Sequence, residues 1–98
     1  MILYRAVSRL ELLDLARMRT FRGGGRLGLE AKLFTPDGED ALFFSSTLTN
    51  PYIVEVDVPD ELAAKLGSQR LDGRAVVAID RELLAEFNAS VTIRLPEV

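Results

Sequence analysis

The sequence predicts a mixed α+β fold, with a curved or partly split β-sheet of five to six strands and four short helices. Apolar segments of strand length recur along the chain, and capped segments of about two to three helical turns lie between them. Helices of this length are too short to be parallel crossovers throughout, which favours an α+β arrangement. Because 98 residues is near the common size of a domain, we expect one domain over residues 1–98.

The expected strands follow from runs of apolar and β-branched residues. The clearest is YIVEVDV at residues 52–58, where apolar and acidic side chains alternate. Further strands are expected from Ile2 at the amino end and at residues 27–34, 74–79 and 90–95. The polar stretch Ser68–Gly73 is expected to be a connector.

Capping residues predict where the helices begin. Ser8 and Glu11 form an S-x-x-E capping box, in which the serine caps a helical amide and the glutamate reaches back. The expected helix runs from about Arg9 to Met18, with inward-facing Leu12, Leu13 and Ala16. The other helices are expected at 39–46 behind Thr35 as cap and Pro36 as first residue, at a short segment opened by Pro59 and ended by Gly67, and at 81–87 between Asp80 as cap and Asn88 as stop.

The first strand carries an unusual charge. Arg5 shares a strand face with Leu3 and Val7, because side chains alternate sides with period two. A guanidinium among apolar neighbours is costly unless acceptors meet it. Either an internal carboxylate or a ligand phosphate could supply them, and both remain open at this point.

Composition excludes several classes of function. The chain has no cysteine and no histidine, which rules out disulfides, thiolate nucleophiles, Cys/His zinc sites and Ser-His-Asp triads. A net charge of −3 with scattered basic residues disfavours nucleic-acid binding. No apolar run is long enough for a membrane span, and no signal peptide is recognisable. We expect a cytoplasmic protein or a module of a larger secreted one.

Two polar stretches are candidate sites. Arg22 and Arg26 flank Gly23–Gly25, whose bare amides could approach a phosphate or simply form a flexible loop. Glu55 and Asp57 share one strand face, where they could serve acid–base chemistry or magnesium, or form a solvated outer face.

The opening LYRAVS, followed by a capped helix and a glycine-rich turn, resembles the start of small bacterial ADP-ribosyltransferase-like domains of the toxin type. GLEAKLFTPDGEDALFF is similar to the strand of that family that ends in an aromatic residue or a Ser-Thr-Ser run and is followed by a helix. YIVEVDVPDEL and AVVAIDRELLAEFN look like its later strands. The family usually has a glutamate entering the penultimate strand, and Asp72 is the acidic residue at that place.

The resemblance implies a function and a set of site residues. Arg5 would hold the pyrophosphate of NAD, assisted by Arg22 or by the loop amides around Gly24. Ser46 or Thr35, the latter beside Phe34, would orient the nicotinamide ribose. Asp72, or else Glu55, would stabilise the oxocarbenium-like transition state of ADP-ribose transfer. The partner would be a protein acceptor or a cognate immunity (antitoxin) protein.

Two alternatives remain. A non-catalytic protein-interaction module of the same fold would use an apolar contact patch, with candidate residues Leu42, Phe43, Phe44 and Ile53. The weaker alternative is a carboxylate metal site at Glu55 and Asp57.

Overall fold

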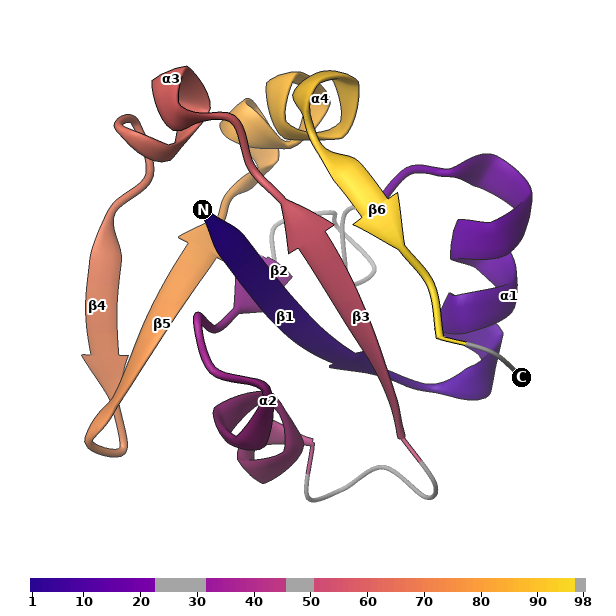
Figure 1. Cartoon of the computed structure of the whole chain (residues 1–98), viewed down its shortest axis with the longest axis horizontal. Helices are drawn as coiled ribbons and strands as arrows, with labels where there is room; N and C mark the ends of the chain where they lie inside the picture. The colour runs from indigo at the N-terminus through magenta and orange to yellow at the C-terminus, as the bar shows by residue number, and fades with distance from the viewer. Residues whose placement is uncertain (23–31, 46–50, 97–98) are drawn as a thin grey trace.

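The computed structural model describes residues 1–22, 32–45 and 51–96. These residues form an α+β fold of two three-stranded antiparallel sheets and four helices, which confirms the predicted fold class (Figure 1). The strands are β1 (Ile2–Val7), β2 (Lys32–Phe34), β3 (Tyr52–Asp57), β4 (Ser68–Leu71), β5 (Arg74–Ile79) and β6 (Thr92–Arg94). The helices are α1 (Arg9–Met18), α2 (Gly38–Phe44), α3 (Asp60–Ala63) and α4 (Arg81–Ser90).

Among the described residues, the two sheets meet at a single bridge. In one sheet β3 lies between β1 and β6, and in the other β5 lies between β2 and β4. The outer edge of β1 contacts the end of β2 through one antiparallel bridge, in which Tyr4 and Thr35 exchange backbone hydrogen bonds of 2.7 and 2.9 Å. Away from this bridge the sheets diverge, so the arrangement is split between β1 and β2 (Figure 1).

The core fills the space between the sheets and the helices. Leu3 and Val7 of β1 are buried, as are the inward valines of β3. Phe21, Phe34 and Phe87 form an aromatic cluster with ring centroids 5.0 to 6.0 Å apart. Because Phe34 is fully buried, β2 is anchored to the core on one face.

Helix α1 begins as expected but presents a different face to the core. The Ser8 side chain accepts from the Glu11 amide at 3.2 Å, which confirms the cap. Leu12 and Leu15 are the buried residues, so Leu12 of the predicted inward face is confirmed, whereas Leu13 is 49 % exposed and Ala16 is exposed, and these two were wrong. The side chain of Glu11 turns toward β1 and binds Arg5 rather than reaching back to the cap.

Two further expectations about helices are corrected. Helix α2 is capped by Asp37, whose carboxylate accepts from the Glu39 amide at 2.8 Å, and not by Thr35, which is used in the bridge to Tyr4. Helix α4 continues past Asn88 to Ser90. Asn88 therefore lies within the helix, and its side-chain amide pairs with the backbone of Phe21 through hydrogen bonds of 2.7 and 2.8 Å.

Strand β4 lies where a connector was expected. Every residue of β4 is exposed. Its sequence, SQRL, therefore needs no apolar face and lacks the alternation of apolar and polar residues by which a strand is predicted. The hairpin turn that joins it to β5 is Asp72–Gly73, with positive φ angles of 52° and 77°. Asp-Gly is a characteristic pair for such turns, and it was the available signal for this hairpin.

Candidate functional site

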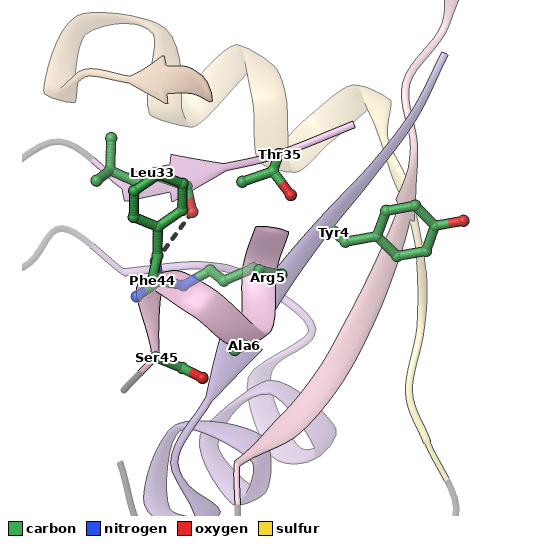
Figure 2. A pocket seen from close by; sticks show the side chains of 8 residues that line it. Tyr4, Arg5, Ala6, Leu33, Thr35, Phe44 and Ser45 are labelled. Atoms are coloured by element: carbon green, nitrogen blue, oxygen red, sulfur yellow. Dashed lines mark hydrogen bonds between the residues drawn. The ribbon is translucent and has the colours of Figure 1, made fainter. Parts of the chain in front are cut away.

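A cavity opens where the two sheets part. It has a volume of about 210 Å³ and lies among β1, the end of β2 and helix α2 (Figure 2). Its lining comprises Tyr4, Arg5, Ala6, Leu33, Thr35, Ala41, Phe44 and Ser45. The lining is mostly apolar, and Arg5 supplies its single formal charge. A concave apolar site with one charged group and a few polar ones is typical of a small-molecule site.

Arg5 is held by the protein itself. Its Nε and Nη2 donate to the two oxygens of Glu11 at 2.8 and 3.1 Å, and its Nη1 donates to the Leu33 carbonyl at 3.1 Å. The side chain extends beneath the ring of Phe44 and is 20 % exposed (Figure 2). Of the two partners open from the sequence, the structure therefore contains the internal carboxylate, and the guanidinium still borders a cavity.

A second cation stands beside this pair. Lys32 Nζ lies 3.6 Å from Glu11 Oε1, and only 13 % of the lysine side chain is exposed. Burial lowers the pKa of Lys32, and the charge of Arg5 lowers it further against the opposing pull of Glu11. Burial alone would raise the pKa of Glu11, but hydrogen bonds from Arg5 and the charges of Arg5 and Lys32 bring it below its ordinary value. Two cations thus share one carboxylate.

The charged cluster extends to the surface through α1. Arg22 Nη2 binds Asp14 Oδ1 at 2.8 Å, and the charge of Asp14 also acts on the pKa of Lys32. Arg22 is 61 % exposed and does not line the cavity. Among the described residues, the cluster contains three cations (Arg5, Lys32 and Arg22) and two carboxylates (Glu11 and Asp14), an excess of one positive charge.

The two aliphatic hydroxyl groups of the lining, those of Thr35 and Ser45, both donate to the backbone. Thr35 Oγ1 donates to the Asp37 carbonyl, and Ser45 Oγ donates to the Leu42 carbonyl at 2.8 Å. Their protons are therefore engaged, and their oxygen lone pairs remain available as acceptors. The ring of Phe44 adds an apolar wall above Arg5 (Figure 2).

The structure brings together only some of the predicted site residues. Arg5 and Thr35 both line the cavity. Phe34 does not, because its side chain points into the aromatic cluster and is fully buried, although Arg5 Cζ lies 6.0 Å from its ring centroid. Gly24 and Ser46 lie outside the described residues.

Asp72 has a different setting. It is exposed in the turn between β4 and β5, where its positive φ is part of the turn geometry. The hairpin contacts α2 through Arg74, which binds Asp40 at 3.1 Å and stacks 3.5 Å from the ring centroid of Phe43. Neither α2 residue lines the cavity, so Asp72 and Arg5 are not brought to one site by the described contacts.

The possible metal site on β3 is occupied by a cation of the chain. Arg94 of β6 binds Glu55 at 2.6 Å and Asp57 at 3.6 Å. Within the described ranges no group of three or more acidic side chains gathers as metal ligands would. The geometry at Glu55 and Asp57 is that of a surface ion-pair network.

Sequence reasoning missed Glu11 and Lys32 as site residues. Glu11 was interpreted through its capping-box position, which explains its spacing from Ser8 but not its side-chain contacts. Lys32 shares a strand face with Phe34, and a lysine on a core-facing side was the available signal.

No helix within residues 1–22, 32–45 and 51–96 has the length and apolar character that crossing a membrane requires. Comparisons with protein-family models, with curated proteins and with solved structures found no match to this chain.

Proposed function

We propose that the chain is an ADP-ribosyltransferase-like domain that binds NAD at the cavity among β1, β2 and α2. The observation that carries the proposal is the position of Arg5, a half-buried arginine on the first strand that borders this cavity. The resemblance in sequence assigns the NAD-contacting arginine to this residue. The excess positive charge of the surrounding cluster supports an anionic ligand.

The size of the cavity suggests which part of the ligand it would enclose. Pockets that bury a whole drug-sized ligand measure roughly 300–1,000 Å³. At about 210 Å³ this cavity is smaller, so it fits one end of a dinucleotide. The aromatic wall of Phe44 and the acceptor oxygens of Thr35 and Ser45 suit a flat ring and a sugar with hydroxyl donors.

The proposed function is binding rather than transfer. Transfer of ADP-ribose would require a carboxylate beside the nicotinamide ribose to stabilise positive charge. Among the described lining residues none is acidic, and Glu11 is engaged by Arg5. Asp72, assigned to that role by the resemblance, lies in the exposed hairpin turn.

Calorimetric titration with NAD tests the proposal. Wild type should give a saturable heat, and Arg5→Lys should weaken binding at least about tenfold, because lysine cannot replace a two-pronged guanidinium contact. Arg94→Lys is the matched control. Arg94 lies on β6, at the edge of the sheet opposite β1, and it pairs with carboxylates of the central strand β3. No heat with wild type, or equal losses in both variants, would contradict the proposal.

A protein-interaction module is a second candidate, favoured by one observation. Leu42 and Phe43 of α2 are 49 % and 43 % exposed, and Leu71 at the end of β4 is 42 % exposed. The patch proposed from sequence is corrected in part, since Phe44 lines the cavity instead. If this candidate holds, titration with NAD gives no heat in the calorimeter. Sedimentation of the protein then shows association through this patch, and Phe43→Ser abolishes that association.

A further inference from the structure

Glu11, which is not itself a lining residue of the cavity, holds the Nε and Nη2 edge of the Arg5 guanidinium, so an anion needs that edge free to make a two-pronged contact with Arg5. The pair has the two-pronged geometry of a carboxylate on Nε and Nη2. A phosphate oxygen pair prefers the same edge, because its spacing matches that of a carboxylate. In the structure this edge is filled by Glu11 of helix α1.

We infer that Glu11 is an internal counter-anion that a ligand phosphate displaces from Arg5, and that Lys32 receives the released carboxylate. Glu11 would thereby set how tightly the cavity holds an anion. This inference rests on the proposed function for the identity of the ligand, while its chemistry requires only a phosphate-type anion.

The spacing of the three groups supports an exchange of partners. Lys32 Nζ lies 3.6 Å from Glu11 Oε1, beyond the roughly 2.7–2.9 Å of a charge-assisted hydrogen bond. Lys32 therefore has a contact that can shorten once Glu11 leaves Arg5. The lysine is only 13 % exposed, so few water molecules compete for it.

The balance of charges among Arg5, Lys32 and Glu11 also supports an exchange of partners. Among the described residues, Arg5 and Lys32 have one carboxylate, Glu11, between them. With a phosphate on Arg5 and Glu11 on Lys32, each of the two cations would have an anionic partner of its own. If the ligand instead bound Arg5 while Glu11 stayed in place, two anions would crowd one guanidinium and repel each other.

Binding of inorganic pyrophosphate, measured by calorimetry, tests the inference without depending on NAD. Glu11→Gln keeps the shape of the side chain and removes its charge, so pyrophosphate affinity should rise about tenfold. Glu55→Gln removes a carboxylate from the ion pair with Arg94 and should leave the affinity unchanged. Unchanged or weaker binding by Glu11→Gln would overturn the inference.

A double-mutant cycle separates partner exchange from simple electrostatics. Lys32→Met should weaken pyrophosphate binding in wild type, because the released Glu11 then lacks a partner. In the Glu11→Gln background the same change should cost clearly less. Equal losses in the two backgrounds would mean that Lys32 acts through its charge alone, and the exchange would be wrong.

A spectroscopic readout covers the case in which Glu11→Gln folds poorly. The Arg5 Nε–H resonance of the wild-type protein, assigned by its loss in Arg5→Lys, reports on the bond to Glu11. Saturating pyrophosphate should shift it, and an unmoved resonance despite measured binding would overturn the inference. NAD binding with no gain for pyrophosphate in Glu11→Gln contradicts only this inference. Pyrophosphate binding with no NAD binding contradicts only the proposed function.

Discussion

Arg5 on β1 and Arg94 on β6 belong to the same sheet and make similar ion pairs in different surroundings. Arg5 is 20 % exposed and is held by Glu11 and a backbone carbonyl beside the cavity. Arg94 is 53 % exposed and binds Glu55 and Asp57 on the neighbouring strand. The type of contact is the same, so burial is what distinguishes the Arg5 pair from the solvated surface pair at Arg94.

The largest expected effect is on the stability contributed by these two arginines. Arg5→Met keeps the aliphatic stem but leaves Glu11 with only a loose contact to Lys32. Breaking a buried pair costs roughly 3–5 kcal/mol, and partial exposure with Lys32 nearby reduces this to about 2–3 kcal/mol of unfolding free energy. Arg94→Met should leave the denaturation midpoint almost unchanged, because exposed pairs are screened by water and salt. Equal shifts in urea denaturation would break the comparison.

A somewhat smaller effect is expected at an uncharged, partly buried contact. Asn88 of α4 pairs with both backbone groups of Phe21, and Phe21 packs edge-on against Phe34. Asn88→Ala should lower the free energy of unfolding by about 1–2 kcal/mol, since it strands two backbone groups. Asn88→Asp, which keeps the acceptor and loses the donor, is the matched variant. A change in neither would show that burial matters only where charge is involved.

Asn88 also shows what sequence reasoning can and cannot reach. Local patterns predicted the α+β class, the caps at Ser8 and Asp80 and the strand at 52–58, because each depends on neighbours in the chain. The pairing of Asn88 with Phe21 joins residues 67 apart in the chain, and no local pattern contains it. The same limit applies to Glu11, whose contact with β1 cannot be read from its capping-box position.

The candidate site shows the same division. Arg5 was found because a charge interrupts an apolar strand, and Thr35 through the family resemblance; both line the cavity. Glu11 and Lys32 acquire their role only when α1, β1 and β2 meet in space. Phe34 was assigned to the cofactor site through the resemblance, and that does not show which way its side chain points; in the structure it is buried in the core and does not line the cavity.

The smallest expected effect is a pH dependence that sharpens the contrast between the two arginine pairs. Binding to Arg5 and the nearby charge of Lys32 outweigh burial and lower the folded-state pKa of Glu11 below its ordinary 4.5. A carboxyl with a lowered folded-state pKa adds stability above its unfolded pKa and loses it as the pH falls through the folded value. Urea midpoints measured from pH 7 downward should therefore decline below about pH 4.5 through this group.

Glu11→Gln should flatten that decline, since no proton can bind at residue 11 in either state. Glutamine also retains an acceptor for Arg5, so the variant is expected to stay folded at neutral pH and give a usable baseline. The shape of the acid limb, rather than the stability at neutral pH, isolates the ionised form of Glu11. If the urea midpoint falls with the same slope at acid pH in both proteins, the ionised pair of Arg5 and Glu11 contributes no more stability than the exposed pair at Arg94. The distinction between the two arginines would then fail.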